Sequence, residues 1–438
     1  MYYPDTLEIV PLAAPVHARV RVPGSKSITN RALVLAALAS RWTACELAGA
    51  LRSEDTEVMV ECLTRLGFRV NADWPAATIR VERNTSGRVI PARQAELFVG
   101  NSGTTMRFVA AMVALGEGTY AFDGVPRMRE RPIEDLLAAL RRLGVDATSV
   151  GGTGCPPVRI RANGFAGGTA VVKSDASSQF LSGLLMAAAF HTGSKLVVQV
   201  NGPVVSEPYI DMTTAMLHAW NVPMESHNSP TERWYAFGEQ VPVPAGPPSH
   251  YTIEPDASAA SYFLAAAAIV GGRVEVLGLR PNMLQGDVAF ADLLARMGCT
   301  LEDTPDGLAI TGGPLRGIDV DMNAISDTAM TLAAVACFAD GPTRIRNVAH
   351  VRHKETDRLA AVACELRKLG ATVEEFADGL AITPGPMRGG PVDTYHDHRM
   401  AMSLALIGLR VPGVVVNNPA CVAKTYPNFW HDLERLRA

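Results

Sequence analysis

An internal repeat of about 77 residues constrains the fold more than any other feature of this sequence. Amphipathic segments end in glycine or asparagine at positions 67, 144, 221, 298 and 370, which are 77, 77, 77 and 72 residues apart. These residue types are typical of the left-handed position that ends a helix. The spacing therefore predicts several copies of one supersecondary unit.

A second pattern alternates with the first. A polar cluster leads into an Ala-, Leu- and Met-rich helical segment six times, starting at Ser25, Asn101, Ser174, Pro255, Ser326 and His396. Alternating polar and apolar residues follow the glycines and are typical of strands. Each unit is expected to read strand, helix, strand, helix, strand, strand. The sixth unit lacks its last strands, and we expect the N-terminal segments 7–12 and 18–24 to supply them.

Six such units suggest two lobes of three. We expect one lobe to hold both chain ends, residues 1–22 and 247–438, and the other lobe, residues 23–246, to be inserted between them. The proline-rich stretch 241–250 suits the linker on the return. The alternative is a solenoid or propeller, but those repeats commonly span about 20 to 50 residues and need no charges at their helix starts.

Composition favours a globular protein, because 48% of the 438 residues are hydrophobic and 19% are charged. The net charge of −4 argues against nucleic-acid and membrane-surface proteins, which carry a basic excess. Apolar stretches such as 262–271 are too short to cross a bilayer, and the N-terminus has no secretory pattern. The seven cysteines form no C-x-x-C pair, so we expect a reduced, cytoplasmic protein without a metal or other cofactor.

The segment 23–31, PGSKSITNR, carries the clearest chemical signal. A glycine, hydroxyl side chains, Lys26 and Arg31 stand at the start of a helix, where backbone N–H groups lack intrahelical partners. Such a cluster is typical of an anion site, although serine and threonine also cap helices for structural reasons. Further cations mark the other helix starts, at Arg107, Arg127, Arg129, Arg131, Lys354, Arg358 and Arg399. Two lobes facing each other are expected to gather these cations at one cleft.

Nine segments along nearly the whole chain resemble the 5-enolpyruvylshikimate-3-phosphate synthase (3-phosphoshikimate 1-carboxyvinyltransferase) family. They are PGSKSITNRALVLAALA, GNSGTTMRF, DGVPRMRERPI, SSQFLSGLLMA, SEPYIDMT, DASAASYFLAAAA, HKETDRL, YHDHRMAMSLAL and AKTYP. The resemblance implies an α/β (α+β) fold: a two-lobed inside-out α/β barrel with three βαβαββ units in each lobe. It also implies a monomeric enzyme that transfers the enolpyruvyl group of phosphoenolpyruvate to the 5-hydroxyl of shikimate 3-phosphate. Phosphate is released by addition and elimination, on the pathway to chorismate and the aromatic amino acids.

The same resemblance implies substrate contacts at matching positions. Shikimate 3-phosphate is expected to contact Lys26, Ser27, Arg31, Ser177, Ser178, Gln179, Tyr209, Asp327, His350 and Lys354. Phosphoenolpyruvate is expected to contact Lys26, Asn101, Gly103, Thr104, Arg127, Gln179, Glu355, Arg358, Arg399 and Lys424. Charge-assisted hydrogen bonds contribute roughly 1.5 to 3 kcal/mol each, so this set suits two small polyanions.

Four residues are candidates for catalysis: Lys26, Asp327, Glu355 and His398. The reaction needs one group that takes the hydroxyl proton and one that protonates the methylene carbon. Asp327 is the candidate for the first role, with a helix cap as the alternative, and Glu355 for the second, although flanking cations favour its ionised form. Lys26 is the candidate donor to the departing phosphate. His398 is expected either to orient this cluster or to be structural.

Two places depart from the family pattern. His350 stands where the family often has asparagine, beside the expected position of the shikimate phosphate. Ser102, Thr105 and Phe108 stand where many members have alanine, alanine and proline, while Gly103 remains. We expect glyphosate, a phosphonate that competes with phosphoenolpyruvate in this family, to fit beside Gly103.

Two other functions are the alternatives. A sister enzyme loads enolpyruvate onto UDP-N-acetylglucosamine, but its opening motif resembles S-K-N-A and it uses a loop cysteine, for which Cys155 is a poor match. The second alternative is a catalytically silent phosphosugar-binding protein on the same scaffold. Lys26, Asp327 and Glu355 together argue against it, because binding alone does not need two carboxylates beside a polyanion.

Overall fold

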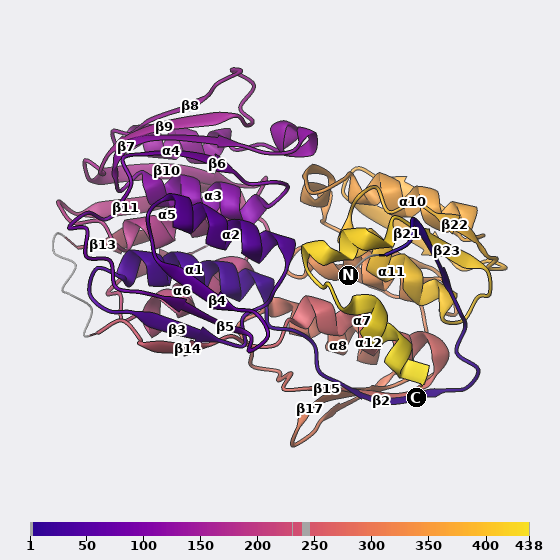
Figure 1. Cartoon of the computed structure of the whole chain (residues 1–438). Helices are drawn as coiled ribbons and strands as arrows, with labels where there is room; N and C mark the ends of the chain where they lie inside the picture. The colour runs from indigo at the N-terminus through magenta and orange to yellow at the C-terminus, as the bar shows by residue number, and fades with distance from the viewer. Residues whose placement is uncertain (1–2, 230, 239–245, 438) are drawn as a thin grey trace. The chain divides into compact units, whose positions relative to one another are not determined.

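The computed structural model describes residues 3–229, 231–238 and 246–437. The chain forms two compact units, which Figure 1 shows. The terminal unit contains Met1–Pro23 and Glu254–Ala438, and therefore both chain ends, whereas the inserted unit is Gly24–Ile253. No helix among the described residues is both long and apolar enough to span a membrane.

The return to the terminal unit comes after Ile253, later than the predicted boundary at residues 246 and 247. The reason is β14 (His250–Thr252), which pairs in parallel with β3 (Cys45–Ala48) and so belongs to the inserted unit. Residues 241–245 of the predicted linker lie outside the described residues.

The inserted unit has three four-stranded sheets, in the spatial orders β14-β3-β5-β4, β6-β7-β9-β8 and β10-β11-β13-β12. In each sheet the first pair is parallel and the next two pairs are antiparallel. The remaining strands are β4 (Val70–Asp73), β5 (Thr78–Val81), β6 (Gln94–Phe98), β7 (Glu117–Asp123), β8 (Asp146–Ser149), β9 (Val158–Asn163), β10 (Gly168–Ser174), β11 (Leu196–Val204), β12 (Glu225–Asn228) and β13 (Arg233–Phe237).

The terminal unit repeats this plan in β2-β15-β17-β16 and β18-β19-β21-β20, and its third sheet is β1-β23-β22. The strands are β1 (Thr6–Ile9), β2 (Val16–Val20), β15 (Gly272–Leu277), β16 (Thr300–Asp303), β17 (Gly307–Thr311), β18 (Asp319–Asp321), β19 (Thr343–Arg346), β20 (Thr372–Phe376), β21 (Gly379–Thr383), β22 (Gly390–Val392) and β23 (Val414–Asn417). The predicted order of strands and helices within a repeat is confirmed by the order of the elements along the chain.

The two N-terminal strands go to different sheets. β1 joins β23 of the sixth sheet, as predicted. The prediction for residues 18–24 is wrong, because β2 runs parallel to β15 and supplies the first strand of the fourth sheet. β14 supplies the equivalent strand of the first sheet. The terminal unit thus takes β2 from the segment just before the chain enters the inserted unit. The inserted unit takes β14 from the segment just before the chain returns to the terminal unit.

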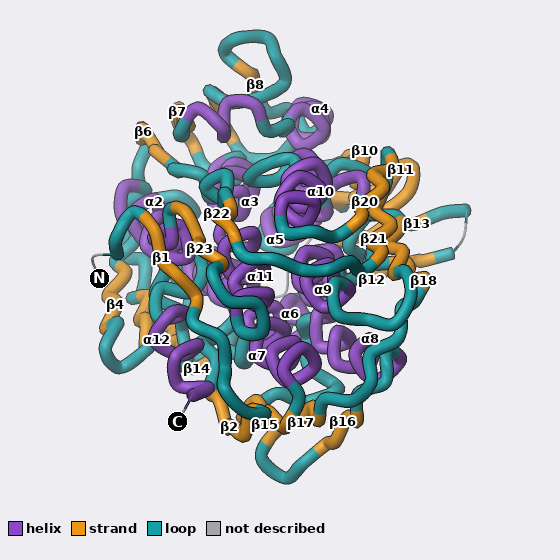
Figure 2. Tube along the Cα trace, turned by 90° about the vertical axis from the view of Figure 1, so that its right-hand side faces the viewer, coloured by secondary structure: helices purple, strands orange, loops and turns teal. Residues whose placement is uncertain are grey.

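Three buried helices form the centre of each unit, and the strands lie outside them (Figures 1 and 2). They are α1 (Lys26–Ala39), α3 (Gly103–Val113) and α5 (Ser178–Ala188) in the inserted unit, and α7 (Ala257–Val270), α9 (Ala329–Ala336) and α11 (His398–Gly408) in the terminal unit. Helices that are apolar on all sides are typical of a core. This arrangement confirms the inside-out α/β fold.

Outer helices are buried on one face only. They are α2 (Glu54–Arg65), α4 (Glu134–Arg142), α6 (Pro208–Ala219), α8 (Phe290–Arg296), α10 (Arg358–Lys368) and α12 (Phe429–Glu434). The predicted helix stops are confirmed, since φ is 88° at Gly67, 84° at Gly144, 55° at Asn221, 114° at Gly298 and 104° at Gly370. Most residues other than glycine and asparagine rarely adopt such positive φ angles, which explains the residue types at these helix ends.

Candidate active site

The N-terminal turns of α1, α3 and α5 meet in the inserted unit, and we call the predicted residues there the inserted half-site. Asn30 of α1 donates a 2.7 Å hydrogen bond to the Thr104 hydroxyl of α3. Lys26, the first residue of α1, lies 3.2 Å from the Asp55 carboxylate of α2. Asp55 is buried, so this ion pair holds the Lys26 ammonium in place. The structure thus adds Asp55, which the sequence showed only as part of a polar helix start.

Arg31 lies inside this cluster and is only 1% exposed. Its guanidinium donates to the Thr213 hydroxyl, to the Ser27 and Tyr209 carbonyls and to the Ser182 hydroxyl, at 2.8 to 3.1 Å. Burial lowers its pKa to about 10. The contact of Arg31 with shikimate 3-phosphate stays a prediction, and what the structure shows is a side chain that ties α1 to α5 and α6.

Gly103 begins α3 at a crowded point. A Cβ atom there would lie 2.6 Å from Arg131 Nη2, 2.9 Å from Arg107 Nη1 and 3.1 Å from Gln179 Oε1. Arg131 also donates to the backbone and side-chain oxygens of Asn101, at 3.0 and 3.2 Å. The absence of a side chain at Gly103 therefore lets two guanidinium groups and an amide approach one helix start.

The other predicted residues of this half-site lie on neighbouring segments. Ser177 caps α5 by accepting a 3.3 Å hydrogen bond from the Gln179 N–H, and Ser178 is buried. Arg127 lies on the 3-10 helix η1 (Pro126–Glu130), partly exposed, and donates a 2.8 Å hydrogen bond to Glu130. Tyr209 stands near the start of α6, with its ring facing the Arg31 guanidinium.

The terminal unit gathers a second group of predicted residues at the starts of its helices, which we call the terminal half-site. Its centre is Asp327, on the 3-10 helix η3 (Ser326–Thr328). One oxygen of Asp327 accepts from Lys354 and, at 3.3 Å, from Arg358, while the other accepts from Arg399 at 2.6 Å. Burial alone would raise the pKa of Asp327, but Arg399, Lys354 and Arg358 outweigh it and hold this pKa well below its usual range. The N-cap residues of η3 and α9 are Ile325 and Thr328, so Asp327 does not occupy the position of the helix-cap alternative.

Glu355 and Asp397 complete the terminal half-site. Arg358 Nη2 donates to Glu355 at 2.9 Å, and its Nε donates to Asp397 at 2.7 Å. Burial would lower the Arg358 pKa, but Asp397, Glu355 and Asp327 outweigh it and raise this pKa. Lys424 ends the 3-10 helix η5 (Pro419–Lys424) with its ammonium 3.8 Å from Glu355. Asp397 was not predicted, although it stands inside the HDHRM segment.

Two histidines border this cluster. His350 lies on the 3-10 helix η4 (Ala349–His353), and its Nε2 is 2.9 Å from the Ser326 hydroxyl. Burial, aided by the Lys354 charge, lowers the pKa of His350 to about 3, so the imidazole is neutral at pH 7. His398 is buried, with Nδ1 3.6 Å from Asp397. The orienting role of His398 stays a prediction.

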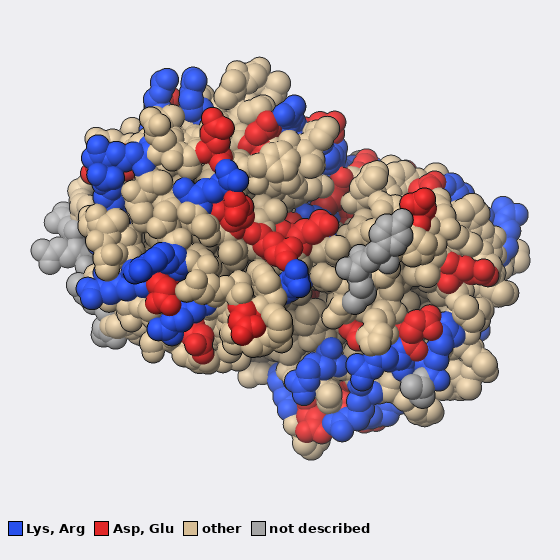
Figure 3. All heavy atoms as spheres, in the orientation of Figure 1, with Lys and Arg blue, Asp and Glu red and all other residues tan. Residues whose placement is uncertain are grey.

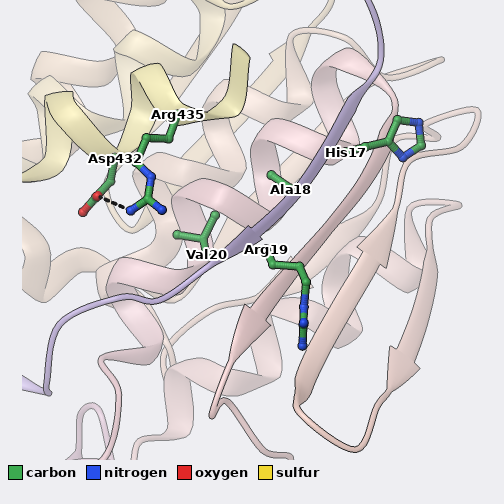
Figure 4. Close-up of a pocket in the computed structure, with 6 residues that line it drawn as sticks. All are labelled: His17, Ala18, Arg19, Val20, Asp432 and Arg435. Carbon is green, nitrogen blue, oxygen red and sulfur yellow. Dashed lines mark ion pairs between the residues drawn. The ribbon is translucent and has the colours of Figure 1, made fainter. Parts of the chain in front are cut away.

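Two surface pockets of the described residues lie apart from both half-sites. A cavity of about 220 Å³ is lined by His17, Ala18, Arg19, Val20, Asp432 and Arg435 (Figure 4). Its cations have acidic partners. On the face that Figure 3 shows, Lys and Arg as well as Asp and Glu side chains are spread over many places. A groove of about 710 Å³ lies along β10, β11 and β13. Neither contains a predicted residue, and among the described residues no group of three or more His, Cys, Asp or Glu is placed to hold a metal.

Comparison with known proteins decides the family. Residues 11–433 match the family described as EPSP synthase (3-phosphoshikimate 1-carboxyvinyltransferase). The chain belongs to the EPSP synthase family. A relative from Nostoc punctiforme with the name 3-phosphoshikimate 1-carboxyvinyltransferase is 47% identical over 97% of this chain and 98% of its own length. The chloroplastic protein of that name from Arabidopsis thaliana is 43% identical over 95% of this chain and 82% of its own.

Solved structures show the same fold. EPSP synthase from Acinetobacter baumannii has a TM-score of 0.78 and 24% identity over 98% of both chains. The enolpyruvyl transferase NikO from Streptomyces tendae has a TM-score of 0.77 and 20% identity over 99% of this chain and 97% of its own. The family assignment confirms the predicted reaction: the chain transfers the enolpyruvyl group of phosphoenolpyruvate to shikimate 3-phosphate, in the shikimate pathway.

Proposed function

We propose that the carboxylates of the terminal half-site transfer the protons at the hydroxyl and the methylene carbon, while residues of both half-sites bind the substrates. The observation that carries the proposal is Asp327, a carboxylate that shares Lys354, Arg358 and Arg399. Substrate phosphate and carboxylate groups attract the same cations. A cation that binds a substrate anion stabilises the Asp327 carboxylate less. The basicity of Asp327 therefore rises. Substrate binding thus prepares Asp327 to take the proton of the 5-hydroxyl.

The predicted ligands then hold the two substrates. Lys354 and His350 of the terminal unit serve shikimate 3-phosphate together with Ser27, Arg31, Ser177, Ser178, Gln179 and Tyr209. Arg358, Arg399 and Lys424 serve phosphoenolpyruvate together with Lys26, Asn101, Gly103, Thr104, Arg127 and Gln179. The neutral His350 imidazole suits a hydrogen-bonding role, because it adds no charge beside Lys354.

In the addition step, the 5-hydroxyl oxygen bonds to the central carbon of phosphoenolpyruvate and its proton passes to Asp327. Glu355 gives a proton to the methylene carbon, which becomes a methyl group of the tetrahedral intermediate. In the elimination step, a methyl proton returns to Glu355 as the carbon–oxygen bond to phosphate breaks. Lys26, whose ammonium lies 3.2 Å from Asp55, donates a proton to the leaving phosphate oxygen. Asp327 then releases the hydroxyl proton to solvent, from which Lys26 regains its own.

Glu355 must be protonated to begin this cycle. Arg358 at 2.9 Å and Lys424 at 3.8 Å favour its carboxylate form. Both cations belong to the proposed phosphoenolpyruvate set, so the ligand's negative charges offset them and favour the protonated acid. His398 is assigned as a positioning residue that supports Asp397, the partner of Arg358.

Phosphate release from phosphoenolpyruvate tests these roles, with and without shikimate 3-phosphate. We expect release that requires shikimate 3-phosphate, falls at least a hundredfold in Asp327→Asn and Glu355→Gln, and keeps shikimate 3-phosphate binding in Glu355→Gln. Tight binding of shikimate 3-phosphate without turnover by the parent protein would instead support the silent-binder alternative. Parent-like turnover in both variants would refute the assignment of the carboxylates.

We also propose that the protein is a cytoplasmic monomer. The described residues include no disulfide, which suits a reducing compartment. Light scattering at micromolar concentration tests the oligomeric state, and a mass near 46.7 kDa is expected for a monomer. A mass twice as large would contradict it.

A further inference from the structure

Two consecutive residues before α11 adopt a backbone conformation that side chains disfavour. The φ angle is 54° at Tyr395 and 55° at His396. Neither is glycine, so this left-handed pair is strained and must be held by its surroundings. Such strain is concentrated at functional sites. The pair follows β22 and directly precedes Asp397.

Asp397 connects this turn to the terminal half-site, because it directly follows the turn and binds Arg358. Its buried carboxylate receives Arg358 Nε at 2.7 Å and Arg358 Nη2 at 3.2 Å. The same carboxylate caps α11 by accepting the Arg399 backbone N–H at 2.9 Å. A shift of the left-handed pair would therefore move Arg358 and Arg399, the two arginines of the terminal half-site that the proposed function assigns to phosphoenolpyruvate.

One side of the turn is tied to α10. The Tyr395 hydroxyl donates a 2.6 Å hydrogen bond to Glu365, which is wholly buried. The second oxygen of Glu365 accepts the Asp393 backbone N–H at 3.1 Å. Lys368 spans the two acids, at 2.9 Å from Glu365 and 2.9 Å from Asp393. These bonds fix the start of the turn against the helix that Arg358 begins.

The other side of the turn is tied to η5. The Asn418 amide donates a 2.9 Å hydrogen bond to His396 Nδ1. Asn418 is itself left-handed, with φ of 52°, and it precedes η5, whose last residue is Lys424. Asn417 beside it donates to Asp393 at 2.7 Å. One hydrogen bond thus joins the segment that carries Arg399 to the segment that carries Lys424.

We propose that Tyr395 and His396, held by Glu365 and Asn418, are positioning residues that set the phosphoenolpyruvate cations of the terminal half-site. The inference rests on the proposed assignment of Arg358, Arg399 and Lys424. The hydrogen bonds of both side chains keep the left-handed pair in place, and the pair delivers Asp397 to Arg358. The strained turn thereby fixes the positions of Arg358, Arg399 and Lys424.

The first test is Tyr395→Phe, which keeps the ring and removes the bond to Glu365. We expect the KM for phosphoenolpyruvate to rise about threefold to tenfold and the KM for shikimate 3-phosphate to change less than twofold. Tyr120→Phe is the matched control, because the Tyr120 hydroxyl also donates one hydrogen bond, at 2.9 Å to the Ala92 carbonyl, in the inserted unit. It is expected to change both constants less than twofold.

The second test is a pair of changes at His396. His396→Ala loses the bond to Asn418 that holds the left-handed pair, so the KM for phosphoenolpyruvate should rise about as far as in Tyr395→Phe. His396→Asn should restore the parent KM within about twofold, because asparagine tolerates the left-handed region and its amide can reach Asn418. Thermal melting of each variant accompanies the kinetics.

The proposal is overturned if Tyr395→Phe and His396→Ala keep the parent KM for phosphoenolpyruvate within twofold. It is also overturned if both KM values rise together in these variants with a lower melting temperature and without rescue by His396→Asn, because that pattern indicates general loss of structure. Arg399→Ala separates this failure from failure of the proposed function. If Arg399→Ala also leaves phosphoenolpyruvate binding unchanged, the assignment of the cations is at fault rather than the turn.

Discussion

The buried arginines of the two half-sites contact different kinds of oxygen atom. In the inserted half-site, Arg31 faces hydroxyl and carbonyl oxygens, and Arg131 faces the backbone and side-chain oxygens of Asn101. In the terminal half-site, Arg358 contacts three carboxylates, those of Asp327, Glu355 and Asp397. Neutral oxygens position a cation without titrating. Carboxylates that share cations change their basicity when a substrate anion binds those cations. This suits Asp327 and Glu355 of the terminal half-site to proton transfer, whereas the inserted half-site mainly binds, with Lys26 beside Asp55 as its proton donor.

The largest expected effect comes from removing one acid of the terminal half-site. Asp327→Asn should lower kcat by about 10²- to 10⁴-fold, because the amide cannot accept the hydroxyl proton. Ser178→Ala in the inserted half-site should instead raise the KM for shikimate 3-phosphate and leave kcat within a few-fold. Steady-state kinetics with both substrates measures the contrast. Equal losses of kcat in the two variants would remove the division of roles.

A stability measurement sharpens the same comparison. Asp397→Ala leaves the buried Arg358 without its closest acid, which should lower the free energy of unfolding by about 3 to 5 kcal/mol. Asp146→Ala breaks an exposed pair with Arg161 in the inserted unit and should cost less than about 1 kcal/mol. Urea unfolding compares the two variants. Similar losses would mean that burial does not decide the strength of these pairs.

His350 predicts a pH dependence. Its pKa is about 3 in the folded protein and roughly 6.5 when unfolded, so below pH 6.5 the unfolded state binds the proton more readily. The contribution of the neutral imidazole is complete above pH 6.5 and is lost as the pH falls towards 3. Between pH 6.5 and 5 the protein should lose about 1.5 to 2 kcal/mol more stability than His350→Asn. An equal loss of unfolding free energy between pH 6.5 and 5 in the two proteins would contradict a buried, neutral His350.

The smallest expected effect is at Gly103. In Gly103→Ala the new methyl group crowds Arg131, Arg107 and Gln179, so the KM for phosphoenolpyruvate should rise about tenfold. Glyphosate inhibition should weaken at least as much if the inhibitor fits beside Gly103. Gly151→Ala is the matched control, because its Cβ meets Thr153 at an ordinary 3.7 Å. An unchanged KM in Gly103→Ala would place phosphoenolpyruvate away from α3.

Local patterns predicted the repeated unit well. The helix stops at Gly67 and Gly370 follow from the residue types that tolerate positive φ, and β1 joins the sixth sheet as expected. The partner of β2 was predicted wrongly, because strand pairing across a crossing point depends on contacts between distant segments. The inserted unit ends at Ile253, later than predicted, because the three-residue strand β14 pairs within it. A strand this short carries little sequence signal of its own.

The sequence proposed the members of the candidate site but not the contacts among them. The motif resemblance named Asp327, Glu355 and Lys26. It did not name Asp55 or Asp397, whose roles follow from the cations they meet in the folded chain.

Proton exchange at the methylene carbon tests the division of roles most directly. The reaction is run in D₂O with both substrates, and deuterium in the methylene group of recovered phosphoenolpyruvate is followed by NMR. The account predicts that the parent incorporates deuterium and that Glu355→Gln does not, while it still binds both substrates. Incorporation by Glu355→Gln at the parent rate would show that another group protonates this carbon, and the terminal half-site would lose its proposed acid.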